Sequence, residues 1–163
     1  MPKVRPALTA RFALLLAAIS LVGCRQHNLE DGTYQFHLGT VIRDDCQLAQ
    51  SNDLINRGTI RTAGHKVKMD YEVLGTPLQM VGSYLDQEIF NSTDRMRLDG
   101  SAANQTTMLN GQECLLDQVV LHLDSTTTDA QSFSGTFSID YESARRSACV
   151  CQFWFNYSAD AVP

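Results

Sequence analysis

Long hydrophobic runs and basic charge are both scarce in this chain of 163 residues. Its main apolar run, residues 12–22, would rise only about 17 Å as a helix, well short of the roughly 30 Å hydrocarbon core of a bilayer. We therefore expect no permanent transmembrane helix. The sequence also lacks G-x-S-x-G, H-E-x-x-H, C-x-x-C and phosphate-loop motifs. It thus predicts no catalytic residues, no metal site and no cofactor, and the expected protein is not an enzyme.

The first residues have the parts of an export signal. Three basic residues (Lys3, Arg5 and Arg11) precede the apolar run. Leu21-Val22-Gly23-Cys24 then resembles the bacterial lipobox, which implies cleavage after Gly23 and a lipidated Cys24. The alternative is an ordinary secretory signal that happens to contain a cysteine. Arg25 stands where an aspartate marks inner-membrane retention, so the resemblance implies the outer membrane. It does not decide whether the domain lies on the periplasmic or the cell-surface face.

These features divide the chain into a signal peptide (1–23), a short lipidated tether (24–31) and a single β-rich domain (32–163). Eight tether residues reach at most about 26–29 Å, which keeps the domain near its membrane. Cleavage would remove three basic residues, leaving 10 basic against 18 acidic residues and a formal net charge of −8. That charge argues against a nucleic-acid partner and leaves the acyl chains on Cys24 as the membrane contact.

Four cysteines remain after Cys24, an even number that predicts two disulfides in an exported chain. The alternative, a metal site of four thiolates, fits poorly because Cys149-x-Cys151 is tighter than the usual C-x₂₋₄-C spacing. Cys149 and Cys151 would share one face of a strand, where a bridge between them is strained. We therefore expect Cys46 and Cys114 each to pair with one of the two, in an order that stays open.

Apolar and polar residues alternate through most of the mature chain, as in half-buried strands. The clearest example is 66–73, where Val67, Met69, Tyr71 and Val73 share one face. We expect strands at 33–38, 59–62, 66–73, 78–84, 95–99, 106–109, 119–123, 132–141 and 149–157. Helical turns are expected within 47–56 and 144–147, and a polar loop at 125–130. Eight to nine short strands predict an all-β antiparallel meander, either a small lipocalin-like barrel or a sandwich; the lack of long crossovers favours the barrel.

The chain's other polar candidates do not form a recognisable motif. Its four histidines (His27, His37, His65 and His122) show no metal-ligand spacing and no neighbouring nucleophile motif. Asp44 and Asp45 could seat a cation or act as an acid–base pair. We expect instead that they end the first strand and begin a turn before Cys46.

A loose family resemblance covers the signal and about the first third of the mature chain. Asp31-Gly32-Thr33-Tyr34 followed by Asp44-Asp45-Cys46-Gln47-Leu48 resembles the opening of small outer-membrane lipoproteins of gliding myxobacteria. Some lipoproteins of that group belong to the gliding-motility machinery of the outer membrane. The resemblance implies a role in surface motility and carries over no catalytic residue.

We expect a non-enzymatic lipoprotein with a docking surface for a cell-envelope complex, with envelope proteins as candidate partners. A lipocalin-like carrier of a small apolar ligand is the alternative, and a hydrolase or inhibitor without a visible motif is a third. Alternation places Trp154, the chain's single tryptophan, opposite the core face of the last strand. It is the candidate partner-binding residue because tryptophan often anchors interfaces.

Overall fold

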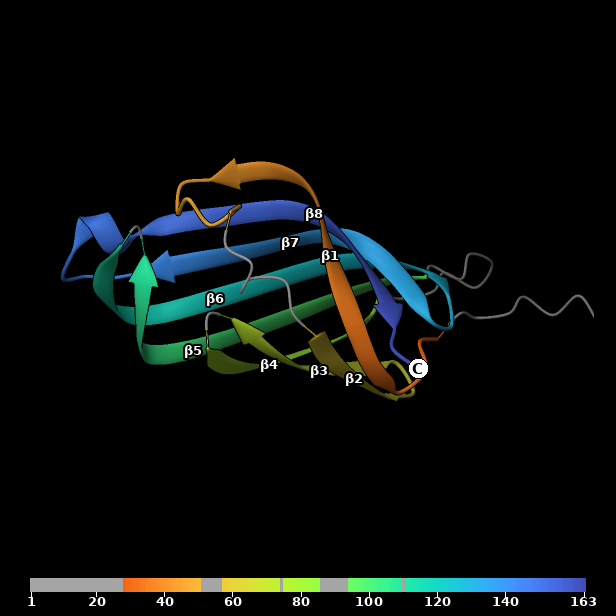
Figure 1. Ribbon diagram of the computed structural model, residues 1–163. Helices are drawn as coiled ribbons and strands as arrows, with labels where there is room; N and C mark the ends of the chain where they lie inside the picture. Colours follow the sequence, from red (N-terminus) through yellow and green to blue (C-terminus); the bar gives the residue numbers. More distant parts are fainter. Residues whose placement is uncertain (1–27, 51–56, 74, 86–93, 110) are drawn as a thin grey trace, which may run out of the picture.

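The computed structural model describes residues 28–50, 57–73, 75–85, 94–109 and 111–163. Its eight antiparallel strands each pair with the next along the chain, and β8 pairs back with β1 to close a barrel (Figure 1). The expected all-β meander is confirmed, and it closes as a barrel. The elements are β1 (Gly32–Asp44), β2 (Arg57–Ala63), β3 (Lys66–Val73), β4 (Thr76–Tyr84), β5 (Arg95–Leu109), β6 (Gln112–Asp129), β7 (Ser132–Glu142), the 3₁₀ turn η1 (Ser147–Cys149) and β8 (Cys151–Ala161).

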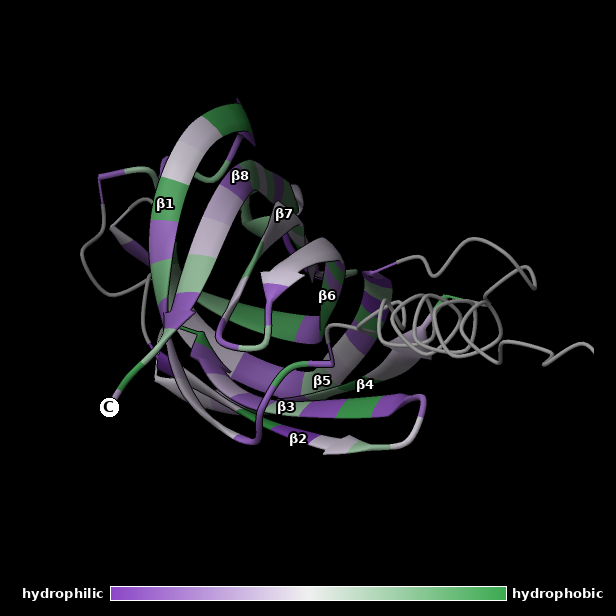
Figure 2. Cartoon of the chain, turned by 90° about the vertical axis from the view of Figure 1, so that its right-hand side faces the viewer, coloured by the Kyte–Doolittle hydropathy of each residue, from purple (hydrophilic) through white to green (hydrophobic). Residues whose placement is uncertain are grey.

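Alternating hydropathy decides which side of each strand faces the interior. The strand predicted at 66–73 is confirmed as β3, and its four apolar side chains are all buried. Bands of hydrophilic and hydrophobic residues alternate along the other strands as well (Figure 2). Because side chains of a strand point alternately to its two faces, this pattern puts the apolar set inside and the polar set outside.

Aromatic rings fill the interior from wall to wall. Tyr71 on β3 and Phe137 on β7 lie four strands apart, on opposite walls, and their ring centroids are 5.5 Å apart. Phe36 on β1 adds contacts at 5.2 Å to Tyr71 and 5.6 Å to Phe133. Rings in contact across the barrel leave no room for a ligand between them at this level.

The first described residues and the C-terminal residues lie at the same end of the barrel, where the Val162 N–H donates to Thr33 O at 2.8 Å. Leu29 is buried, and its N–H donates to the Tyr84 hydroxyl at 2.9 Å. The Glu30 N–H donates to Ala130 O at 2.8 Å, and the Tyr34 hydroxyl donates to Glu30 O at 2.8 Å.

Both disulfides lie at the opposite end. Cys46 pairs with Cys151, and Cys114 pairs with Cys149. The expectation that Cys46 and Cys114 each pair with one of the later two cysteines is confirmed. The tip of the β5–β6 hairpin, whose Leu109 is buried, curls across this end of the barrel (Figure 1). The Cys114–Cys149 bridge fastens that tip to η1.

Three expectations about local structure were wrong. Segments 95–99 and 106–109 belong to one strand, β5, which continues through Asn104, a residue with positive φ. Asparagine tolerates that conformation, so the strand continues where the alternation of apolar and polar residues is interrupted. The polar segment 125–130 lies largely within β6 and does not form a loop. Its Ser125 and Thr127 are buried and form hydrogen bonds, Ser125 with the Tyr157 hydroxyl and Thr127 with Asp94 O.

The third error concerns Cys149. It ends η1 and does not share a face of β8 with Cys151, because its partner Cys114 lies on β6, two strands away from β8. A helical turn was expected at 144–147, and η1 forms slightly later, at Ser147–Cys149. Most of 47–56 lies outside the described residues. Within the described part of the chain, no helix is long and apolar enough to cross a membrane.

Candidate functional site

Trp154 stands on the outer face of β8, as alternation predicted. Its side chain is 40% exposed, whereas Phe153 and Phe155 on either side of it are buried in the barrel. Its cross-strand neighbours are Ser138 on β7 and Arg43 on β1. Ser138 is a small residue, so the neighbour of the indole ring on β7 adds little bulk beside it.

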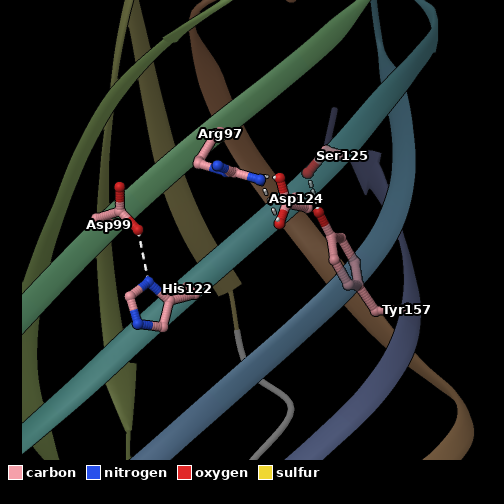
Figure 3. Close-up of polar contacts among 6 residues, drawn as sticks. All are labelled: Arg97, Asp99, His122, Asp124, Ser125 and Tyr157. Atoms are coloured by element: carbon pink, nitrogen blue, oxygen red, sulfur yellow. Dashed lines mark hydrogen bonds and ion pairs between the residues drawn. The ribbon is translucent and has the colours of Figure 1, made fainter. Parts of the chain in front are cut away.

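Two polar side-chain pairs bridge β5 and β6 on the outer surface (Figure 3). Arg97 donates to the two carboxylate oxygens of Asp124 at 2.8 and 3.3 Å. His122 Nδ1 lies 2.6 Å from Asp99 Oδ1. Each pair joins residues that face each other in the strand register. The hydrogen bonds with Asp124 raise the pKa of Arg97. All four side chains are well exposed, so solvent screens both pairs and their contribution to stability is small.

A second polar network lies between Trp154 and the disulfide end. Arg43 donates through Nε to Asp45 at 2.6 Å and through Nη1 to Gln152 Oε1 at 2.9 Å. Gln152 in turn donates to Asp140 on β7. The network fixes the carboxamide of Gln152 on the outer face of β8, two residues before Trp154. Asn156 has the equivalent position two residues after it.

Asp99, His122 and Ser138 lie side by side on β5, β6 and β7, the order of residues in a serine hydrolase relay. Nucleophilic catalysis would also need a serine–histidine hydrogen bond and donors for an oxyanion. The hydrogen bonds among the described residues include none between His122 and Ser138. Backbone N–H groups in the middle of a paired sheet are already engaged in the ladder. The row can therefore bind polar groups, but it lacks the parts needed for acyl transfer.

Tyr141 and Tyr157 differ in how their buried hydroxyls are bonded. Tyr157 is hydrogen-bonded to Ser125. Tyr141 Oη has no hydrogen-bond partner within the described structure, and it lies beside a cavity of about 10 Å³ lined by side chains such as Val73, Thr107 and Leu116. Burial raises the pKa of both tyrosines. The cavity is about the size of a single water molecule.

The remaining predicted positions are scattered. Cys24 and His27 lie outside the described residues. His37 is exposed, with Nε2 3.7 Å from Asp160 Oδ2, and His65 lies in the β2–β3 turn. Asp44 ends β1, and its carboxylate accepts N–H groups from Leu48 at 2.8 Å and Ala49 at 3.0 Å, so it begins a turn as expected. Within the described ranges, no group of three His, Cys, Asp or Glu side chains could hold a metal ion.

Sequence reasoning did not identify the partners of His122, Arg97 and Gln152. Alternation puts each of them on the polar face of its strand, but which residues meet across strands depends on register, and register requires the fold. Searches against protein-family descriptions, curated proteins and solved structures found no match to this chain.

Proposed function

We propose that this protein is a non-enzymatic, lipid-anchored lipoprotein of the outer membrane that offers a docking surface to a cell-envelope complex. The observation that carries the proposal is the contrast between the two sides of the β8 wall. Inside, aromatic rings pack across the barrel; outside, Trp154 is exposed beside an open polar surface. A protein of this form acts through its outer face.

The geometry of the tether supports this role. Acyl chains on Cys24 would hold the end of the barrel that contains Leu29 within about 18 Å of the membrane surface. β8 begins at the opposite end, at Cys151, and Trp154 lies three residues along it. The indole ring is thus presented away from the membrane, where a partner can reach it.

A carrier of small apolar ligands remains the alternative for a closed barrel. The packing counts against it, because Tyr71 and Phe137 meet across the interior and the described cavity beside Tyr141 has a volume of about 10 Å³. Ligand pockets are typically several hundred Å³ in volume. A part in gliding motility is proposed only because the signal and about the first third of the mature chain resemble lipoproteins of gliding myxobacteria.

The test compares the full-length protein with Trp154→Ala, both tagged and expressed at native level. The variant should remain exported, lipidated and thermally stable, yet recover fewer envelope partners after mild solubilisation. Val81→Ala is a matched control, since Val81 is 55% exposed on β4, on the opposite wall. Recovery of the same envelope proteins in equal amounts by wild type and Trp154→Ala would refute a docking role for this face.

A further inference from the structure

The outward face of β7 carries small side chains between two strands with larger ones, an arrangement that we call the β7 groove. The outward side chains of β7, the floor of this groove, are small and hydroxylated along most of the strand: Ser132, Ser134, Thr136 and Ser138. Larger side chains on the neighbouring strands form the walls, including His122 and Asp124 on β6 and Trp154 and Asn156 on β8. The strand has 11 residues, so the floor extends for about 34 Å.

Three surface hollows lie in a row along this floor. One of about 410 Å³ lies at Ser132, one of about 440 Å³ at Ser134–Thr136, and one of about 380 Å³ at Asp140–Glu142. Ser138 and Trp154 line none of the three hollows: Ser138 lies between the last two, and its cross-strand neighbours are His122 on β6 and Trp154 on β8. His122 is bonded to Asp99 on β5, the side away from β7, so its ring is drawn away from the floor (Figure 3).

The lining chemistry excludes several kinds of occupant. Carboxylates of Asp124, Asp129 and Asp140 line the hollows, and the mature chain has a formal net charge of −8, which disfavours polyanions such as nucleic acid. Polar walls disfavour an apolar chain. A peptide could not join as an extra strand, because β7 is paired on both sides, with β6 and β8.

Neutral sugars match the lining of the β7 groove, which disfavours the other kinds of occupant. The hydroxyl, carboxylate and carboxamide groups along the groove supply both donors and acceptors for sugar hydroxyl groups. The exposed indole of Trp154 offers a flat apolar face against which the C–H face of a pyranose ring can pack. Asn156 and Gln152 flank that indole on the same face of β8. Gln152 is already held in place by Arg43 and Asp140, which lowers the entropic cost of ordering it on binding.

We infer that the β7 groove binds an extended neutral polysaccharide, with one sugar ring stacked on Trp154. The inference rests on the proposed function, since it names the class of partner that the outer face of β8 takes. Several sugar units would lie along the strand, so that their individually weak contacts add up to a higher overall affinity.

The single tryptophan makes the test direct. Full-length protein, purified in detergent with its disulfides intact, is titrated with cellohexaose, chitohexaose and maltohexaose while Trp154 fluorescence and its quenching by acrylamide are recorded. At least one hexasaccharide should shift the emission and protect the indole, with saturation. Dextran sulfate, a polyanion, should not bind.

Variants locate the site. Trp154→Ala, followed by calorimetry, should weaken binding about tenfold or more. Thr136→Tyr, which fills the floor without touching the core face, should also weaken it, whereas Val81→Ala on the far wall should leave it unchanged. Thermal unfolding of each variant separates loss of binding from loss of fold. Binding that survives both Trp154→Ala and Thr136→Tyr overturns the proposal.

The outcomes also separate the inference from the proposed function. No response to any hexasaccharide at millimolar concentration, together with Trp154-dependent recovery of envelope proteins, would overturn the polysaccharide proposal and leave the docking role standing. Sugar binding that depends on Trp154, with no protein partner recovered, would support the inference and identify the envelope polymer as the docking partner. If no sugar binds and recovery of envelope proteins does not depend on Trp154, both the polysaccharide proposal and the docking role are overturned.

Discussion

Cys149 and Cys151 lie two residues apart, yet their disulfides reach different strands on either side of β8. Cys149 leaves η1 to meet Cys114 near the start of β6, and Cys151 opens β8 to meet Cys46, just after β1. The short segment 149–151 is therefore a common anchor for β6, two strands away from β8 on one side, and for the end of β1, which pairs with β8 on the other side. Both bridges secure the end that would point away from the membrane.

We predict that both bridges are important for stability, and that Cys46–Cys151 contributes more. Its sequence separation is 105 residues against 35 for Cys114–Cys149. Loop-closure entropy then gives about 4–5 kcal/mol for the longer loop and about 3–4 kcal/mol for the shorter. Urea unfolding of the paired variants Cys46→Ala/Cys151→Ala and Cys114→Ala/Cys149→Ala measures the difference. A Cys46–Cys114 peptide in a non-reducing digest would contradict the pairing itself.

Tyr141→Phe should stabilise the protein. The buried Tyr141 hydroxyl has no partner within the described structure, and an unpaired buried polar group costs about 1–3 kcal/mol. Its removal should raise the free energy of unfolding by about 1 kcal/mol, measured by urea unfolding. Tyr34→Phe is the matched control: the Tyr34 hydroxyl donates to Glu30 O at 2.8 Å, so its loss should destabilise. If Tyr141→Phe were destabilising, the hydroxyl would have a partner such as a bound water molecule in the small cavity.

Stability should fall in alkaline solution. Burial raises the pKa of Tyr34 to about 12, whereas tyrosine in an unfolded chain titrates near 10. Between those values the unfolded state loses the proton and the folded state keeps it. The contribution of Tyr34 to the free energy of unfolding is therefore fully present below pH 10 and is lost as pH rises towards 12.

The corresponding measurement is urea unfolding from pH 8 to 12. In Tyr34→Phe, the fall of unfolding free energy with pH should be shallower by up to about 1.4 kcal/mol per pH unit. The comparison of slopes is independent of the hydrogen bonds that the variant loses at every pH. Parallel slopes for wild type and variant would show that Tyr34 does not titrate differently in the two states.

Cys24 should be acylated. Cells that express the full chain are expected to incorporate labelled palmitate into it, and Cys24→Ala should abolish the label and release the barrel from the membrane fraction. Cys46→Ala/Cys151→Ala is the control for loss of cysteine as such, and it should remain labelled. Undiminished label in Cys24→Ala would rule out the lipobox interpretation.

Local pattern predicted the parts of this protein that depend on neighbouring residues. Alternation located β3 and the outward orientation of Trp154, because side-chain direction in a strand reverses at each residue wherever the strand lies. It failed at Asn104 and at 125–130, where a bend and buried hydroxyls interrupt the apolar pattern without ending the strand. The even number of cysteines predicted two disulfides, and the spacing of Cys149 and Cys151 excluded a bridge between them.

Only the tertiary structure decided what meets across the barrel. The order of the disulfides, the contact of Tyr71 with Phe137 and the pairing of His122 with Asp99 all join residues brought together by barrel closure and strand register. The groove along β7 also depends on register, because its small residues form a floor only when β6 and β8 set their larger side chains beside them. A sequence specifies the direction in which each side chain of a strand points; which strand lies next to it, and in what register, is decided by the packing of the whole chain.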